Sequence, residues 1–238
     1  MFFIQEKSIT ISDKMISDDR VEALLEKYVK NNSVISFGTG PTNEAFIKKL
    51  ALYIESNGLR VRVVPTAHSI GILCSQLKLA TVALDDVDVD LAFDFVDQID
   101  EDFNYISNET TSLIRDKMIA QNAGELVVVA EEKDFVKKLT CPMTVEISSF
   151  AVNKTIAQLM NLGEPTLRQK NGKPVLSETG HYFVDIKCDE IYSLDDLDYQ
   201  AKAIAGVLET SLFIGFADRV VLHGANLIVK SRMNNPEA

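Results

Sequence analysis

Three segments of the chain contain residues that could bind an anion or move a proton. The first, SFGTGPT at residues 36–42, follows an apolar run and precedes a helical pattern. A glycine turn at the start of a helix presents backbone N–H groups, which bind phosphate. The turn lacks the third glycine of a dinucleotide fingerprint and the lysine of a P-loop, so a plain turn with Thr42 as a helix cap is an open alternative. Thr66 and Ser69 follow the next apolar run, where they would be further donors or caps.

The second segment, DFVDQID at residues 94–100, places carboxylates at the end of an apolar run. Asp94 lies between Phe93 and Phe95, and burying a carboxylate is costly unless it is paired or used. This position favours a functional role for Asp94 and Asp97 over the alternative of a solvated acidic loop. A divalent metal site is a weaker alternative, because the acids show no Ca²⁺-loop spacing and no histidine joins them.

The third segment, TTSLIRDK at residues 110–117, combines hydroxyl groups with charges one turn later. Taken alone, these residues favour helix capping and a solvated face over a catalytic role. The three histidines, His68, His181 and His223, share no motif and are interpreted as structural.

Composition restricts the partners and the compartment. The chain has 238 residues, of which 46% are hydrophobic and 25% charged, as is typical of a folded globular protein. The formal net charge of -11 argues against nucleic acid and anionic membranes as partners. We expect no membrane span and no secretory leader, because no apolar run has the length or the flanks for either. Cys74, Cys141 and Cys188 lie far apart and outside any metal spacing, so we expect free thiols and a cytoplasmic location.

Alternating strands and helices must position the three segments. Apolar runs predict strands over residues 34–37, 59–64, 89–95 and 125–130. Helical spacing predicts helices over residues 17–30, 42–56, 70–79, 112–123 and 133–139. This alternation predicts an α/β protein with a parallel Rossmann-like sheet flanked by helices. Its ligand site is expected outside the carboxyl ends of the strands.

The pattern changes after Pro142. Strands are predicted over residues 144–147, 166–170 and 182–187, and helices over residues 151–162 and 194–204. These elements predict a smaller α+β, ferredoxin-like insertion domain over residues 144–210. Strands predicted over residues 219–223 and 227–230 return the chain to the first domain, which comprises residues 1–143 and 211–238.

Short motifs in a fixed order resemble the A-type ribose-5-phosphate isomerases over nearly the whole chain. The family motifs GTGST, DGADE, LTREK, PVEV, GN and GVVExGLF correspond here to residues 38–42, 94–98, 113–117, 144–147, 180–181 and 206–213. The resemblance implies reversible conversion of ribose 5-phosphate to ribulose 5-phosphate through an enediolate, without metal or cofactor. The implied partner is a small phosphorylated sugar, and self-association as a homodimer or homotetramer is expected.

The resemblance also assigns roles to residues. Asp94 and Asp97 match the two acids that handle ring opening and hydroxyl protons, and Asp116 matches the glutamate base. The expected substrate-binding residues combine the positions that match the family with the hydroxyl groups that follow the second strand. They are Thr39, Gly40, Thr42, Thr66, Ser69, Ser107, Asn108 and Lys133.

The chain departs from the family at several of these positions. Ser107 stands in place of the catalytic lysine, residues 108–110 replace glycines beside it, and Pro41 replaces a serine of the phosphate turn. The side chain of Asp116 is one methylene shorter than the glutamate of the family, a difference large enough to misplace the carboxylate as a base. Loss of a cationic donor at a developing oxyanion typically costs on the order of 10² to 10³ in rate.

Two hypotheses follow from these departures. In the first, the protein is an isomerase whose positive charge comes from Lys117, Lys133 or Arg115. In the second, it is a catalytically degenerate relative that binds a sugar phosphate as a sensor or interaction protein. Retention of three acids favours the enzyme, because a module that only binds an anion has little use for carboxylates.

Overall fold

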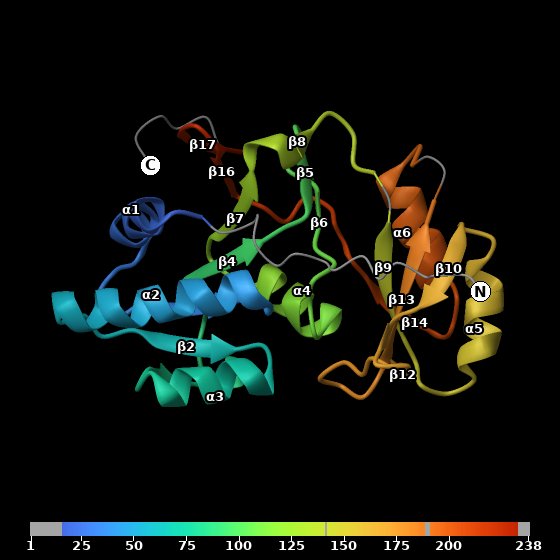
Figure 1. Ribbon diagram of the computed structural model, residues 1–238, viewed down its shortest axis with the longest axis horizontal. Coiled ribbons are helices and arrows are strands. Elements are labelled where there is room, and N and C mark those ends of the chain that lie inside the picture. The colour runs from blue at the N-terminus through green and yellow to red at the C-terminus, as the bar shows by residue number, and fades with distance from the viewer. Residues whose placement is uncertain (1–15, 141, 189–190, 233–238) are drawn as a thin grey trace, which may run out of the picture.

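A seven-stranded sheet forms the centre of the larger part of the molecule (Figure 1). The computed structural model describes residues 16–140, 142–188 and 191–232. The strands follow the order β17-β16-β7-β4-β1-β2-β3. Their bounds are β1 Val34–Phe37, β2 Arg62–Pro65, β3 Ala80–Thr81, β4 Leu91–Phe95, β7 Leu126–Glu131, β16 Arg219–His223 and β17 Leu227–Ser231. Neighbouring strands run parallel except β17, which pairs antiparallel with β16 at the edge.

The strand order contains one reversal, between β1 and β4. From β1 the chain moves outward to β2 and β3, and it then returns to place β4 on the other side of β1. In doubly wound sheets such a reversal opens a crevice at the carboxyl ends of the two strands, where ligands bind. The predicted parallel Rossmann-like sheet is confirmed. Its reversal lies between β1, which the glycine turn follows, and β4, which contains Asp94.

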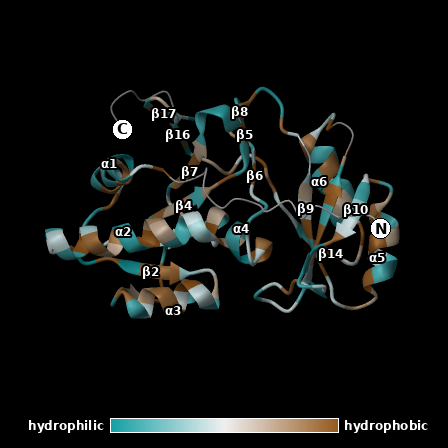
Figure 2. Cartoon of the chain, viewed as in Figure 1, coloured by the Kyte–Doolittle hydropathy of each residue, from teal (hydrophilic) through white to brown (hydrophobic). Residues whose placement is uncertain are grey.

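Helices cover both faces of this sheet. Helices α1 (Asp18–Tyr28), α2 (Pro41–Asn57) and α3 (His68–Gln76) share one apolar core with Ile35 and Phe37 of β1. Val34 points to the opposite face, because successive strand residues alternate, and it joins a second core with Ile119 of α4. Helix α2 alternates hydrophobic and hydrophilic residues along its length (Figure 2), and it ends at Gly58, whose φ of 62° suits glycine.

Helix α4 spans Leu113–Asn122, and two short 3₁₀ helices, η1 and η2, span Leu84–Asp86 and Glu132–Asp134. No helix in the described ranges has the length and apolar character required to cross a bilayer. Two of the three cysteines, Cys74 and Cys188, fall in those ranges, and Cys74 is a buried free thiol. Cys141 lies outside the described residues.

A second sheet, drawn to the right in Figure 1, has the order β10-β13-β9-β14. Its elements are β9 Met143–Ile147, α5 Val152–Leu159, β10 Glu164–Leu167, β13 Tyr182–Lys187, α6 Leu194–Lys202 and β14 Val207–Thr210. A hairpin of β11 (Gln169–Lys170) and β12 (Lys173–Pro174) turns at Asn171 and Gly172, which have positive φ. The β-α-β-β-α-β order is that of ferredoxin-like motifs. We infer from it an insertion domain over residues 144–210, within a Rossmann-like domain of residues 1–143 and 211–238.

A third, four-stranded sheet joins short segments that the sequence does not mark as strands. Its strands are β5 Gln98–Asp100, β6 Tyr105–Ile106, β8 Phe135–Val136 and β15 Leu212–Phe213, in the order β15-β6-β5-β8. The helix predicted over residues 133–139 is therefore wrong. Phe135 pairs with Ile99 instead, because a ladder partner distant in sequence outweighs the local helical spacing.

Candidate functional site

The glycine turn after β1 lies directly against the acid in β4. A Cβ atom built on Gly38 would lie 3.1 Å from Asp94 Oδ1 and 3.3 Å from Asn43 Nδ2, so only glycine leaves both groups in place. Asp94 is the penultimate residue of β4, and only 9% of its surface is exposed. The two segments therefore meet at the crevice that the strand order defines.

Hydroxyl groups link this turn to the third acid. Thr39 Oγ1 donates to Thr110 Oγ1 at 3.5 Å, and the Thr110 hydroxyl in turn donates a short hydrogen bond to Asp116 Oδ2. Thr39 Oγ1 also accepts from the backbone N–H of Thr111 at 2.9 Å. Asp116 lies in the first turn of α4, whose N-cap is Ser112. The hydroxyl-rich start of α4 therefore both caps the helix and contacts an acid.

The remaining acid, Asp97, holds the loop that precedes α4. Its Oδ2 accepts from the backbone N–H of Asn108 at 2.7 Å. Ser107, next to Asn108, is buried, and its hydroxyl favours the ionised form of Asp94. The three acids, which come from the second and third segments, thus lie around one loop of residues 107–110.

Burial and neighbouring charges raise the pKa of two acids of this cluster, Asp94 and Asp116. Burial, and then the charge of Asp97, raises the pKa of Asp94 to about 7. Burial, and then the charge of Asp94, raises the pKa of Asp116 well above its ordinary value, although the Thr110 hydroxyl opposes the change. Tyr105 is buried beside Asp94 and Asp116, and burial followed by their charges raises its pKa as well. Carboxyl groups of this kind can accept and donate protons near neutral pH.

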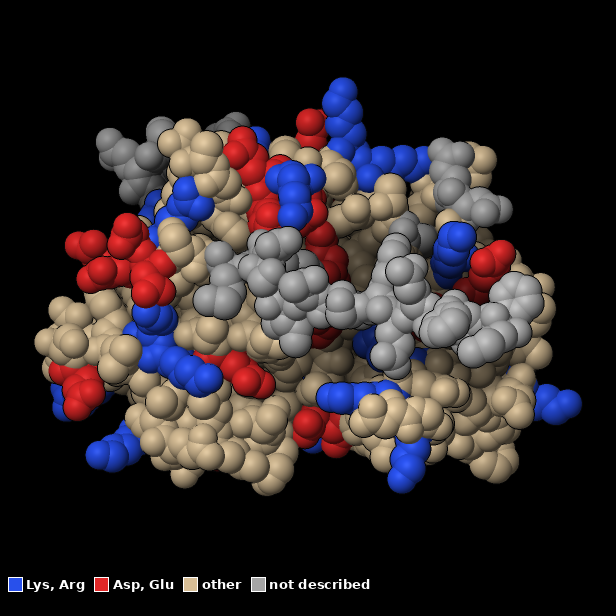
Figure 3. Space-filling model, in the orientation of Figure 1, with Lys and Arg blue, Asp and Glu red and all other residues tan. Residues whose placement is uncertain are grey.

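Unpaired buried oxygens concentrate around these acids. In the part of the chain that the structure describes, seven buried side-chain oxygens have no hydrogen-bond partner. One is the Tyr28 hydroxyl, and the other six are Asn43 Oδ1, the Tyr105 hydroxyl, Asn108 Oδ1, Thr111 Oγ1, Asp116 Oδ1 and Glu131 Oε1. Buried polar atoms are nearly always paired in folded proteins, so this concentration indicates a surface that binds a polar molecule. Acidic atoms are visible in the hollow near the centre of the face shown in Figure 3.

One cavity beside the acids is lined by residues of the glycine turn. Thr39, Gly40 and Thr42 line it together with Asn43 and His223. The first three were predicted to hold an anion, and the N-terminus of α2, a 17-residue helix, begins at Pro41 next to them. Backbone N–H groups at such a helix start favour a phosphate.

The other predicted binding residues have different surroundings. Thr66 donates to the carbonyl of Phe37 at 3.0 Å, and its hydroxyl favours the ionised form of Asp116, so it belongs to this cluster. Ser69 is exposed at the start of α3, and no hydrogen bond joins it to the acids in the described residues. Lys133 in η2 is largely exposed and pairs with Glu131 at 2.9 Å.

Two of the three cations suggested to replace the family lysine point elsewhere. Lys117 Nζ lies 2.8 Å from Glu209 Oε1 of β14, so it faces the second sheet. Arg115 donates to the carbonyl of Thr66 at 3.1 Å and lies 3.8 Å from Glu178. The contacts of these two side chains therefore give no support to a direct interaction of either cation with the acids.

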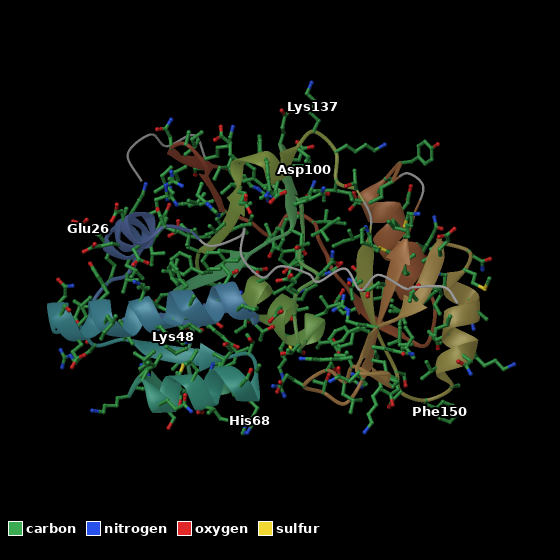
Figure 4. The ribbon with its side chains drawn as sticks, in the orientation of Figure 1. Glu26, Lys48, His68, Asp100, Lys137 and Phe150 are labelled. Carbon is green, nitrogen blue, oxygen red and sulfur yellow. The ribbon has the colours of Figure 1, made fainter. Side chains whose placement is uncertain are left out.

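Sequence reasoning missed Thr110, Asn43, Tyr105 and Glu146. Glu146 is fully buried in β9, and its Oε2 accepts from the backbone N–H of Ile114 in α4 at 3.3 Å. Its Oε1 accepts from the Thr179 hydroxyl at 2.7 Å and lies 3.2 Å from His181 Nδ1. An acid within an apolar strand was the signal that identified Asp94, and the same signal was available for Glu146. Glu178, next to Thr179 in the chain, accepts from the backbone N–H of His68 at 2.9 Å. This contact joins the loop that contains Thr179 to the start of α3, where Figure 4 labels His68.

The fold and the site together define an α/β protein with a cluster of acids beside the glycine turn at the switch point of a doubly wound sheet. Comparison with known proteins gives the family. The model of the family described as ribose 5-phosphate isomerase A (phosphoriboisomerase A) matches residues 62–226. The ribose-5-phosphate isomerase A of Bacillus mycoides (strain KBAB4) is 32% identical over 203 residues, which cover 84% of this chain and 91% of that protein. The counterpart in Brucella suis biovar 1 (strain 1330) is 32% identical over 208 residues, covering 84% and 89%.

Solved structures agree with this match. Ribose 5-phosphate isomerase A from Methanocaldococcus jannaschii superimposes with a TM-score of 0.81 at 29% identity, covering 91% of this chain and all of that one. A D-ribose-5-phosphate isomerase solved in complex with phospho-erythronic acid gives 0.82 at 27% identity, again covering 91% and 100%. The chain belongs to the ribose 5-phosphate isomerase A family, and the resemblance found in the sequence is confirmed.

Proposed function

We propose that the protein interconverts ribose 5-phosphate and ribulose 5-phosphate through an enediolate, with Asp116 as the base. The observation that carries this proposal is the convergence of Asp94, Asp97 and Asp116 beside the turn at residues 38–42. Family membership supports the same reaction, since the relatives bear the name of that enzyme.

The proposed chemistry moves one proton between adjacent carbons. Asp116 removes the proton from C2 of the open-chain aldose, and the electrons of that C–H bond form the C1–C2 double bond and leave a negative charge on the C1 oxygen, which gives the enediolate. A proton then moves from the C2 oxygen to the C1 oxygen, and Asp116 returns its proton to C1, so that the ketose forms. A raised pKa makes Asp116 a stronger base than an exposed aspartate. Asp94 and Asp97 are the proposed carriers of the hydroxyl protons and open the sugar ring.

The phosphate is proposed to bind at the start of α2. Thr39, Gly40 and Thr42 line the cavity there, and the helix N-terminus offers N–H groups to an anion. Lys133 pairs with Glu131, which lines the same cavity, and is proposed to contribute charge to it. Ser107 and Asn108 are proposed to face the reacting end of the sugar.

A second function, a sugar-phosphate sensor without turnover, is favoured by one observation. Ser107 stands where the family has its lysine, and the two neighbouring cations of α4 are engaged with other partners. The same site would then bind the ligand and leave it unchanged.

One experiment separates the two functions. Formation of ribulose 5-phosphate from ribose 5-phosphate is measured with the wild type, Asp116→Ala and, as a control at an exposed acid, Asp88→Asn. We expect turnover by the wild type and by Asp88→Asn, and a loss of about 10² to 10⁴ in kcat for Asp116→Ala. Phospho-erythronic acid should raise the Tm of all three. If the wild type is as inactive as Asp116→Ala while the ligand still raises the Tm, the sensor is correct; no shift in Tm excludes both.

We further propose that the protein acts in the cytoplasm as a homodimer or homotetramer. The free thiol of Cys74 supports a reducing compartment. Large apolar side chains exposed in the second sheet and its helices support self-association, and Phe150, at 85% exposure, projects outward there (Figure 4). Light scattering of the wild type and of Phe150→Ser gives the oligomeric state, and a monomeric wild type would contradict the proposal.

A further inference from the structure

Asn108 is held from three directions by three separate segments. Its backbone N–H donates to Asp97 Oδ2 at 2.7 Å, and its Nδ2 donates to the carbonyl of Pro142 at 3.1 Å. Its carbonyl accepts from Arg168 Nη1 at 3.0 Å. Arg168 follows β10 in the second sheet, so a residue of that part of the chain reaches the loop of residues 107–110.

Arg168 is itself fixed in one orientation. Its Nε donates to Asp185 Oδ2 at 3.1 Å, and its Nη2 donates to Thr144 Oγ1 at 2.6 Å and to Asp185 Oδ1. The Thr144 hydroxyl donates to Asp185 Oδ1 at 2.8 Å, and the guanidinium lies 5.2 Å from the centre of the Phe183 ring. This planar fork leaves Nη1 directed at Asn108, an arrangement that a lysine ammonium does not reproduce.

The bond to the Asn108 carbonyl also sets the direction of the next N–H group. In a planar trans peptide the C=O and the following N–H point in opposite directions. The N–H of Glu109 therefore points away from Arg168, and it donates to no other residue in the described ranges. Glu109 lines the cavity that Thr39 and Gly40 also line. Asn108, on one side of Glu109, contacts Asp97, and Thr110, on the other side, contacts Asp116, so this backbone donor lies between residues that contact two of the acids.

We infer that Arg168 is a positioning residue for the reaction. By holding the Asn108 carbonyl, it fixes the loop of residues 107–110 so that the Glu109 N–H donates to the enediolate oxygen, in place of the ammonium that the family lysine supplies. This inference rests on the proposed isomerase function. Removal of one preorganised donor to an oxyanion typically costs on the order of 10² to 10³ in kcat.

The first test is a kinetic comparison of Arg168→Lys with the wild type and with Arg60→Lys, an exposed control. We expect kcat for Arg168→Lys to fall by about 10², with KM for ribose 5-phosphate within about threefold. The midpoint of the acidic limb of the pH profile should not move, because Arg168 acts on the backbone and not on the carboxyls. A kcat within threefold of the wild type overturns the inference, as does a loss of kcat matched by an equal rise in KM.

A second variant keeps the test decisive if Arg168→Lys folds poorly. Asp185→Asn removes the charge that orients the guanidinium and should lower kcat in the same way. The double variant Arg168→Lys/Asp185→Asn should be no slower than Arg168→Lys, because both changes break one interaction. Additive losses would show that Asp185 acts by another route and would contradict the inference.

Binding provides a readout that does not depend on turnover. Calorimetry in the Asp116→Asn background measures the affinity for ribose 5-phosphate and for phospho-erythronic acid, whose carboxylate carries negative charge where the enediolate develops it. Arg168→Lys should weaken binding of phospho-erythronic acid about tenfold and that of ribose 5-phosphate by less than threefold. If Arg168→Lys weakens the binding of both ligands equally, the inference about Arg168 is overturned and the proposed function is not. A wild type without turnover overturns the proposed function while the calorimetry still tests Arg168, and no binding of either ligand overturns both.

Discussion

Replacement of Asp94 by asparagine is expected to stabilise the protein, and to do so increasingly as the pH rises. The side chain is 9% exposed, and its pKa is raised from an ordinary value of 3.8 to about 7, by burial first and then by the charge of Asp97. Between these two values the folded protein holds a proton that the unfolded chain has released. The free energy of unfolding of the wild type therefore falls as the pH rises from about 4 to about 7.

The magnitude follows from the two pKa values. At pH 8 the wild type loses at most about 4 kcal/mol relative to a protein in which the group stays neutral. At pH 5 the loss is roughly 2 kcal/mol, and near pH 3 it vanishes, because both states are then protonated. Asparagine has a similar shape and no charge, so Asp94→Asn avoids this loss while losing the proposed proton carrier.

Urea unfolding of the wild type and of Asp94→Asn at pH 4, 6 and 8 measures this difference. Asp88→Asn, at an exposed aspartate, is the control and should change stability by no more than about 0.5 kcal/mol. We also expect Asp94→Asn to lose isomerase activity at every pH. If the stability difference between Asp94→Asn and the wild type is the same at pH 4 and pH 8, the burial of a protonated acid at this position is refuted.

Three further changes test other parts of the site. Thr110→Val removes a hydroxyl that favours ionised Asp116, so the pKa of that acid should rise further and the acidic limb of kcat/KM should move up by roughly one pH unit. Gly38→Ala places a Cβ 3.1 Å from Asp94 Oδ1, and kcat/KM should fall roughly tenfold with little change in Tm; an unchanged rate would mean that Asp94 can shift freely. Lys117→Met breaks a buried ion pair with β14, and urea unfolding should show a loss of about 2 kcal/mol.

The elements that determine the fold were largely predictable because their signals are local. The apolar run at residues 34–37 is β1, and the helix predicted over residues 42–56 is α2 to within one residue at each end. The short sheet of β5, β6, β8 and β15 was not predictable in this way. Its strands contain two or three residues each, and their stability comes from ladder partners far along the chain.

The site was predictable where one residue conflicts with its neighbours. Asp94 within an apolar strand is such a conflict, and the structure finds it buried against the glycine turn. Thr110 gives no such signal, since a hydroxyl just before a helix is ordinarily read as a cap. Its bond to Asp116 belongs to the loop of residues 107–110, whose Asn108 carbonyl accepts from Arg168, 60 residues further along the chain.

Asp116 and Lys117 are neighbours in α4, yet they serve different halves of the molecule. The carboxyl reaches the loop beside the main sheet, whereas the ammonium is anchored to Glu209 of the second sheet. Any tilt of the second sheet therefore pulls on the helix that carries the proposed base, and a displacement of about 1 Å at a reacting group costs roughly 10²-fold in rate. The two halves are consequently coupled through α4, and the contacts of Lys117 with the second sheet bear on the position of a carboxyl that they do not touch.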